Sequence, residues 1–280
     1  MVNDCVSAGI RSDYYEEMGK LPFGRLLYLN YINAKPNDFV YATLGDGYII
    51  LLDRSGRLYS LGFSHYDECK VPQGSSFVKV VSGDNHCVAL TVEGKVYKWG
   101  CNYDLQLSFD DLSCVDICCN SSHSVLLTDK GEVKVYGSNY YCLSVPRNVK
   151  DVFYINALEN NILAIRDDHT VFAWGEIKLR KKVKGIVSAH FTSDDIVALL
   201  DNGEVISLLG VRKYDFQEVV YVASSSQFLC VLNHNGEMFG YSLFGQFSVP
   251  QGDGYCFVNL YEDKGIAINN GHFIVWNLND

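Results

Sequence analysis

The sequence predicts an all-β protein, a seven-bladed β-propeller whose blades are four-stranded sheets. Three observations support this prediction: a hairpin pattern that recurs at a nearly constant period, a further apolar run before each hairpin, and no convincing helical pattern between the hairpins. In each hairpin two short apolar runs flank one turn residue. The seven turn residues are Gly56, Gly94, Gly131, His169, Gly203, Gly236 and Gly271. Successive turn residues are 33 to 38 residues apart, which is a typical length for one structural repeat.

Matching positions of the seven units have matching chemistry. The position four residues before the turn is apolar in every unit, as expected for a strand that is buried on both faces. It holds Leu52, Leu90, Leu127, Ile165, Leu199, Leu232 and Ala267. The position five residues after the turn is leucine or aromatic, and we expect its aromatic side chains to be buried between neighbouring blades. It holds Leu61, Trp99, Tyr136, Trp174, Leu208, Tyr241 and Trp276.

The turn chemistry supports a hairpin in every unit. Asn202-Gly203, Asn235-Gly236 and Asn270-Gly271 are Asn-Gly pairs, which favour two-residue turns with both central residues at positive φ. His169 stands where the other units have glycine. We therefore expect a looser turn in the fourth unit.

The remaining strands of each unit lie on either side of the hairpin. An apolar run such as FVKVVS, from Phe77, precedes each hairpin, and shorter runs such as LQLSF, YCLSVP and GQFSVP follow several of them. The seventh unit ends after its third strand, and residues 26–34 resemble the missing fourth strand. We expect these residues to pair with the last blade and to close the ring, which would cover the exposed edges. Residues 26–280 then form one propeller domain, and residues 1–25 form an extension with a short helix at 13–18.

The composition of the chain limits which partners and which cellular location we expect. The 280-residue chain is 48% hydrophobic and 20% charged and has a formal net charge of −10. An acidic chain is a poor match for nucleic acid, whose phosphates need a basic surface. No apolar stretch is long enough to cross a membrane, and no secretory signal is recognised. We therefore expect a cytoplasmic protein, with a nuclear location as the alternative, whose ten cysteines are free thiols.

One unit carries a family resemblance. The stretch SGDNHCVALTVEGKVYKWGCNYDLQLS resembles the regulator of chromosome condensation repeat in its glycines, histidine, Val-Tyr-x-Trp-Gly-x-Asn segment and Gln-Leu pair. The matching residues are Gly83, His86, Leu90, Gly94, Val96, Tyr97, Trp99, Gly100, Asn102, Gln106 and Leu107. The third unit keeps His123, Leu127, Gly131, Val133, Tyr136, Gly137 and Asn139, and the last units keep little beyond the turn. The resemblance also implies a seven-bladed propeller.

No motif for catalysis, metal binding or cofactor binding is found in the sequence. His86 and His123 stand in one column, eight residues before their turn glycines, where other units have tyrosine, asparagine, aspartate or phenylalanine. We interpret both as hydrogen-bonding residues between blades. The other histidines and the cysteines lack paired metal-ligand spacing. We therefore expect no enzyme activity, no catalytic residue, no metal and no cofactor.

The segments that follow the hairpins combine aromatic and acidic residues. Two interpretations are open: packing between loops, or a protein-binding rim, because Tyr and Phe are favoured at interfaces. The predicted contact residues are Phe63, Tyr66, Tyr103, Asp104, Tyr140, Tyr141 and Phe244. The segment 178–185, KLRKKVKG, carries five basic residues in this acidic chain. It is either a solvated loop between the fourth and fifth blades or a charged docking patch.

The sequence thus favours a monomeric, non-enzymatic propeller that binds a protein partner through one face. The alternative that the family resemblance implies is guanine-nucleotide exchange on, or activation of, a Ran-type small GTPase. In that family the activity resides in particular loops and a protruding wedge, which the fold alone does not supply. A hydrolase is a third hypothesis, based only on the tendency of propellers to hold sites at the channel mouth.

Overall fold

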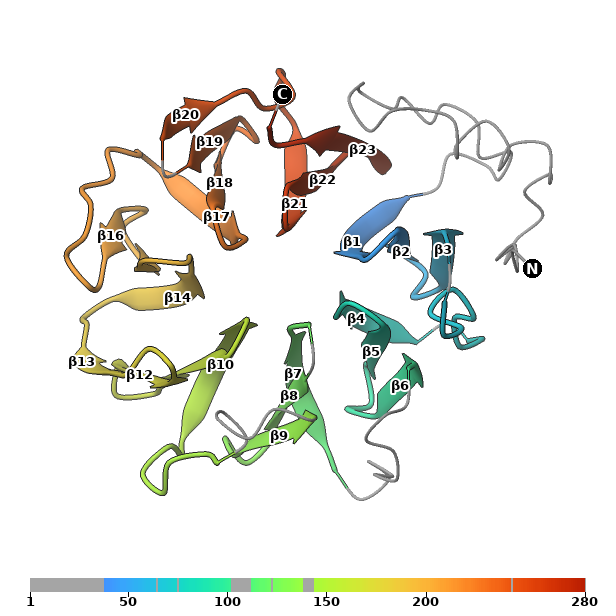
Figure 1. The fold of residues 1–280 in the computed structure, drawn as a ribbon, viewed down its shortest axis with the longest axis horizontal. Coiled ribbons are helices and arrows are strands. Elements are labelled where there is room, and N and C mark those ends of the chain that lie inside the picture. Colours follow the sequence, from blue (N-terminus) through green and yellow to red (C-terminus); the bar gives the residue numbers. More distant parts are fainter. Residues whose placement is uncertain are drawn as a thin grey trace.

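The computed structural model describes residues 38–63, 65–74, 76–101, 112–121, 123–137, 144–242 and 244–279. Over these residues the chain forms seven separate antiparallel sheets. The sheets are arranged around a common centre, with the first strand of each sheet on the inside (Figure 1). In the described ranges, no helix is long and apolar enough to cross a membrane. The predicted all-β architecture with seven repeated sheets is therefore confirmed.

The strands follow the chain order sheet by sheet. The first three sheets contain β1 (Phe39–Gly45), β2 (Tyr48–Asp53) and β3 (Leu58–Gly62); β4 (Phe77–Ser82), β5 (His86–Thr91) and β6 (Val96–Gly100); and β7 (Cys114–Cys119), β8 (His123–Thr128) and β9 (Val133–Gly137). The next two contain β10 (Val152–Leu158), β11 (Asn161–Arg166), β12 (Thr170–Gly175) and β13 (Leu179–Lys182); and β14 (Ile186–Phe191), β15 (Ile196–Leu200) and β16 (Val205–Ser207). The last two contain β17 (Val219–Ser224), β18 (Phe228–Asn233), β19 (Met238–Ser242) and β20 (Gly245–Phe247); and β21 (Tyr255–Tyr261), β22 (Lys264–Asn269) and β23 (His272–Asn277).

Within the described ranges, two sheets carry a fourth strand and five have three strands. β20 forms at the predicted run GQFSVP and pairs with β19. β13 pairs with β12, so the basic segment 178–185 begins as an outer strand rather than as a solvated loop. The runs LQLSF and YCLSVP lie wholly or largely outside the described residues. The predicted strand at 26–34 and the predicted extension at 1–25 also lie outside them.

The fifth unit departs from the four-stranded prediction for a visible reason. Residues 208–218 follow β16 without forming a strand. Instead, the rings of Tyr214 and Phe216 stack on each other and meet Tyr241 of the sixth sheet edge to face. Side-chain packing therefore occupies the place of a fourth strand in this unit. For these two aromatic residues, the interpretation as loop packing is confirmed.

One backbone hydrogen bond recurs between neighbouring sheets. The first residue of an inner strand donates its N–H to the carbonyl of the turn residue in the preceding sheet. The donors and acceptors are Phe77 and Gly56, Cys114 and Gly94, Val152 and Gly131, Val219 and Gly203, and Tyr255 and Gly236, at 2.9–3.1 Å. The same bond joins Phe39 of the first sheet to Gly271 of the seventh at 3.2 Å. In the fourth unit the His169 carbonyl instead accepts from the N–H of Val183, which follows β13 of the same sheet, at 2.9 Å.

The turn glycines are required by both conformation and space. Gly236 has a φ of 75°, in the left-handed region that side chains disfavour. A Cβ atom at this position would lie 2.7 Å from the backbone nitrogens of Gly254 and Tyr255. Glycine therefore permits the turn and also lets the next inner strand approach closely enough to bond with it.

The turn geometry corrects two predictions. At Asn202-Gly203 and Asn235-Gly236 only the glycine has positive φ, because these hairpins have loops longer than two residues, with a left-handed residue at the end of the turn. Only at Asn270-Gly271 are both residues at positive φ. The turn at His169 is not looser: its N–H donates to the Arg166 carbonyl at 2.8 Å, and the histidine itself adopts a φ of 64°. A non-glycine residue can adopt this conformation at a modest cost in free energy.

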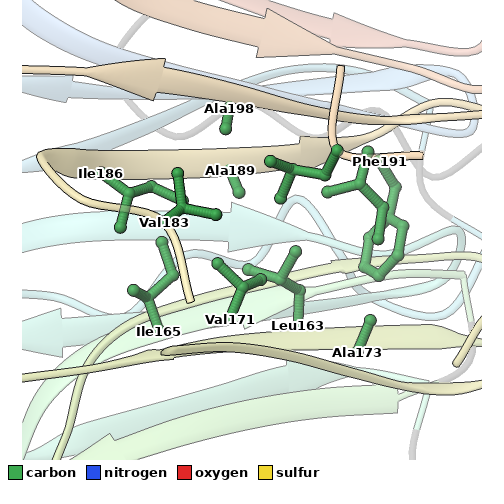
Figure 2. Close-up of a cluster of buried hydrophobic side chains, with 11 residues drawn as sticks. Leu163, Ile165, Val171, Ala173, Val183, Ile186, Ala189, Phe191 and Ala198 are labelled. Carbon is green, nitrogen blue, oxygen red and sulfur yellow. The ribbon is translucent and has the colours of Figure 1, made fainter. Parts of the chain in front are cut away.

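The hydrophobic core lies between neighbouring sheets, not at the centre of the ring. Figure 2 shows the cluster between the fourth and fifth sheets, where Leu163, Ile165 and Val171 face Ile186 and Ala189. Similar clusters join other neighbours, and one of them joins the first and seventh sheets. The middle strands are the most deeply buried, as their unbroken apolar runs predict. Both faces of each middle strand are thus covered by side chains.

The column of aromatic residues five positions after the turn is buried in part. Trp174 and Trp276 are buried between sheets, as predicted. Trp99 and Tyr136 are only half-buried. The Trp99 indole donates from Nε1 to the Glu68 carbonyl at 2.6 Å. This side chain therefore also fixes the segment that follows β3.

The two aligned histidines are buried and hydrogen-bonded. His86 Nε2 shares a hydrogen bond with Ser124 Oγ of the next sheet at 3.1 Å, which confirms its predicted role between blades. His123 instead bonds to Asn120 of its own sheet. Burial lowers the pKa of both imidazoles to about 4. Both side chains are therefore neutral near pH 7 in the folded protein.

We predict that replacing Gly236 with alanine destabilises the fold more than the same change at Gly47. Gly47 also has positive φ, at 79°, but no atom lies within 4 Å of the position of its added Cβ. Gly47→Ala should cost about 1–2 kcal/mol of unfolding free energy, from the backbone alone. Gly236→Ala should cost about 1–3 kcal/mol more, because the added carbon crowds the next strand. Urea unfolding measures both values, and equal losses would contradict the role assigned to this contact.

We also predict that acid weakens the fold in a histidine-dependent way. The unfolded chain takes up protons near the ordinary histidine pKa of about 6.5, whereas the folded protein does so only near 4. Stability is therefore greatest above pH 6.5 and falls as the pH drops toward 4, by about 1.4 kcal/mol per pH unit for each such histidine. Urea unfolding from pH 7 to 5 should show a smaller slope in His86→Gln than in the parent protein. The exposed His272→Gln variant should retain the parent slope, and an unchanged slope in His86→Gln would refute the assignment.

Candidate functional site

The two ends of the ring differ in construction. The hairpin turns with the seven turn residues form one end, which we call the turn face. The connections from first to second strands and the segments after third strands form the opposite end, which we call the loop face. The turn face is constrained by the bonds to neighbouring inner strands. On the described part of the loop face, backbone bonds between neighbouring sheets are fewer: Asp84 donates its N–H to the Ser121 carbonyl at 3.4 Å, and Ser193 donates to the Ser226 carbonyl at 2.7 Å. Its segments are therefore less constrained and differ more between units.

Phe244 is the most exposed of the predicted contact residues in the described ranges. It lies on the short connection between β19 and β20, and its side chain is 95% exposed. Its N–H donates to Ser242 Oγ at 3.2 Å, and Gly245 follows with a φ of 118°. Backbone pairing of Ser242 with Gly245 closes the connection. A tight hairpin thus holds an apolar ring out into the solvent.

Phe63 and Tyr66 are two further aromatic residues on the loop face, and both are partly exposed. Their side chains are 43% and 44% exposed. The Tyr66 N–H donates to the Glu68 carboxylate at 2.8 Å, and Glu68 itself is buried. Lys70 pairs with Asp67 at 2.9 Å. The segment is therefore fixed in place, but its two acidic residues are not free surface charges.

The remaining predicted contact residues cannot be placed. Tyr103, Asp104, Tyr140 and Tyr141 lie outside the described residues. The loop face that the structure describes therefore holds three of the predicted aromatic residues, Phe63, Tyr66 and Phe244. Phe63 and Tyr66 belong to the first unit, and Phe244 belongs to the sixth.

Sequence reasoning missed a layer of mostly polar residues around the central channel. A cavity of about 710 Å³ occupies this channel. Each inner strand has a β-bulge after its first residue, and a bulge re-aims the side chains that follow it. The third residues of the inner strands are Tyr41, Lys79, Asp116, Tyr154, Ser188, Tyr221 and Phe257. The sequence signal that could have revealed this layer was the charged residue within each of the apolar runs FVKVVS and VDICCN.

The channel layer is held together by polar and aromatic contacts. Lys79 Nζ lies 2.6 Å from Asp116 Oδ1 and forms an ion pair across two sheets. His190 Nε2 lies 3.2 Å from both Tyr154 Oη and Ser188 Oγ. The rings of Tyr41 and Tyr221 contact Phe257, with centroid distances of 4.4 and 5.7 Å. The layer therefore links inner strands that share no backbone ladder.

Burial moves the pKa values of several titratable groups in the channel away from neutral pH. Burial lowers the pKa of His190 to about 4, and the Lys79 charge contributes to this shift. Burial raises the pKa of Tyr41 and Tyr154, and it raises that of the Cys118 thiol well above its ordinary value. These groups are thus neutral near pH 7. In the described part of the chain, no group of three His, Cys, Asp or Glu side chains is placed to hold a metal ion.

Part of the chain matches a known protein family. Residues 77–106 and 114–141 match the family model described as the regulator of chromosome condensation (RCC1) repeat. A search of curated protein sequences gives no match. The matched segments are the second and third units, where the sequence resemblance is strongest.

Solved structures share the fold at low sequence identity. The CRINKLY WD40 ectodomain of the Arabidopsis thaliana receptor kinase ACR4 matches with a TM-score of 0.70 and 16% identity, over 86% of this chain and 99% of that one. Yeast RCC1 (Prp20), from its structure with Kap60, matches with a TM-score of 0.63 and 14% identity, over 85% and 79%. Human WBSCR16 matches with a TM-score of 0.59 and 16% identity, over 76% and 77%. The chain thus carries RCC1 repeats, in an all-β fold of seven antiparallel sheets that matches known propeller structures.

Proposed function

We propose that this protein is a non-enzymatic β-propeller that binds a protein partner through its loop face. The observation that carries the proposal is the exposure of Phe244 beside the backbone pairing of Ser242 with Gly245. Burying a phenylalanine side chain on binding contributes about 1.5–3 kcal/mol. Phenylalanine has few rotatable side-chain bonds, so its ring loses little conformational entropy when a partner covers it. Phe63 and Tyr66 extend the aromatic character of this face.

The charge of the loop face indicates the chemistry of the partner. Asp84, Glu159 and Glu262 line the cavity where it opens on this face. Glu159 and Glu262 also have left-handed backbones, with φ values of 51° and 49°. Complementary charge steers association and sets orientation. The proposed partner therefore presents an apolar pocket for an aromatic ring and basic groups around it.

The alternative is guanine-nucleotide exchange on, or activation of, a Ran-type small GTPase. The RCC1-repeat match at 77–106 and 114–141 favours it, because yeast RCC1 shares both the repeat name and the fold. A nucleotide-release assay with fluorescent GDP on a Ran-type GTPase separates the two functions. Many-fold acceleration by the purified protein would replace the binding proposal with the exchange activity.

We also propose that residues 26–34 add a fourth strand to the seventh sheet and so close the ring. In the described residues β23 is the outermost strand of that sheet, and an unpaired edge favours association with another strand. The first and seventh sheets already share a hydrophobic cluster and the bond from Phe39 to Gly271. A strand supplied by residues 26–34 would add backbone pairing to this contact.

Replacing Phe244 with serine should weaken partner binding at least about tenfold without changing the melting temperature, because a hot-spot side chain contributes about 2 kcal/mol or more. The partner is first recovered from cytosol and identified, and its affinity is then measured by calorimetry. Val92→Ser is the matched control, since Val92 is 72% exposed but lies in a hairpin turn of the turn face. Tyr103→Ala with Tyr140→Ala should weaken binding in the same way. Loss of binding in Val92→Ser alone would show that the wrong face was chosen.

Deleting residues 1–35 should lower the melting temperature by about 5–10 °C, which for a chain of this size reflects a few kcal/mol of stability. Deleting only residues 1–24 is the control, and it should leave the melting temperature almost unchanged. Differential scanning calorimetry measures both. If the longer deletion melts like the full-length protein, residues 26–34 do not complete the seventh sheet.

A further inference from the structure

We propose that β13 is a docking edge for an acidic, extended peptide segment of a partner protein. The proposal concerns the outer rim of the fourth sheet and is independent of the loop face. In Figure 1, β13 lies at the periphery, beyond β12. It pairs with β12 on one side, and the described residues supply no strand on its other side.

The strand carries a concentration of positive charge, and among its cations in the described part of the chain only Lys182 acts on a nearby carboxylate, that of Asp168. Five basic residues lie in and around it, and all are exposed. They are Lys178, Arg180, Lys181, Lys182 and Lys184. Among the ion pairs of the described residues, none involves these five side chains. In a chain with a net charge of −10, this group stands out as a basic patch without an ion pair of its own.

The fold itself does not require these charges. β20 occupies the same outer position in the sixth sheet, and its sequence is Gly-Gln-Phe. The fifth unit has no strand at this position at all. The basic residues of β13 are therefore a property of this unit and not of the outer strand in general.

The strand is held in place before any partner arrives. Leu179 packs into the cluster between the fourth and fifth sheets, and the buried Val183 anchors the other end (Figure 2). Val183 also donates its N–H to the His169 carbonyl at 2.9 Å. Ordering costs on binding are small for a segment that is already fixed.

Two of the side chains are also positioned. The Arg180 guanidinium lies over the Phe172 ring, 5.4 Å from its centroid. Lys181 Nζ donates to the Leu208 carbonyl of the fifth sheet at 3.0 Å and keeps further N–H donors free. Arg180 and Lys182 alternate with Lys181 along the strand, so positive charge is present on both faces of the edge.

This combination fits an acidic peptide strand better than a nucleic acid. An open sheet edge presents N–H and C=O groups, which pair with the backbone of another peptide. Carboxylates at every second position of that peptide would then lie on one face and meet Arg180 and Lys182, which share a face of β13. Phosphate chains need a basic surface that extends over several contacts, whereas this patch is one short strand on an acidic protein. Lysines on an edge strand also oppose pairing with like copies, which selects for a partner of opposite charge.

The test uses a fluorescein-labelled ten-residue peptide of alternating glutamate and threonine, with fluorescence anisotropy on the full-length protein. We expect binding that weakens as the salt concentration rises, and at least about tenfold weaker binding to the Arg180→Gln, Lys182→Gln double variant. The control is Arg147→Gln with Lys150→Gln, which removes the same two charge types from exposed positions elsewhere. This control should bind within about twofold of the parent.

Further probes separate strand pairing from plain charge attraction. A glutamate-proline-proline repeat lacks most of the backbone N–H donors on both edges of an extended strand, and it should bind at least about fivefold more weakly. The Arg180→Glu, Lys182→Glu variant should lose the acidic peptide and bind a lysine-threonine peptide instead, which keeps the test valid if the glutamine variant is unstable. Equal binding of the proline peptide or of a glutamine-threonine peptide would overturn the proposal. The proposal would also be overturned if an RNA oligonucleotide bound more tightly than the acidic peptide and its binding depended on Arg180. A dimer detected by light scattering and disrupted in the double variant would overturn it as well.

Discussion

The fold depends on one contact that is repeated around the ring: the hydrogen bond from the start of each inner strand to the carbonyl of the preceding turn residue. It joins sheets that share no β-ladder, and it recurs at six junctions, including the one between Phe39 and Gly271. The contact sets the spacing of neighbouring sheets at the turn face, and the hydrophobic clusters then fill the space between them. Glycine at the turn serves both the left-handed backbone and the close approach.

The centre of the ring presents the opposite problem. Seven inner strands meet there without backbone pairing, and a cavity of about 710 Å³ remains between them. The bulged third residues occupy this region with side chains of very different chemistry. The Lys79–Asp116 ion pair gains strength where water is scarce but also loses hydration, so its net contribution to stability is small. Its effect is to fix the neighbouring inner strands β4 and β7 in one relative position.

The sequence predicted those features that depend on local chemistry. The turn glycines were visible because a left-handed residue is needed at the same place in every hairpin. The buried middle strands were visible because both of their faces are apolar. The channel layer was not identified, because its position holds tyrosine in three units and lysine, aspartate, serine or phenylalanine in the others, and its chemistry appears only when the strands converge. The shape of the His169 turn was mispredicted, since histidine can adopt a φ of 64° when the surrounding contacts hold it there.

The outer position was predicted in the sixth unit, where the run GQFSVP forms β20, but not in the fifth, for a physical reason that bears on function. The middle strand of each unit is covered on both sides by neighbouring sheets, so its side chains must fit a fixed space. The outer position has a neighbour on one side only, and the chain uses that freedom differently in three successive units. The fourth unit places a basic strand there, the fifth packs Tyr214 and Phe216 there, and the sixth places β20, next to the exposed Phe244. Differences between units therefore collect at the rim and on the loop face, where a side chain can change without disturbing the contacts that hold the ring together.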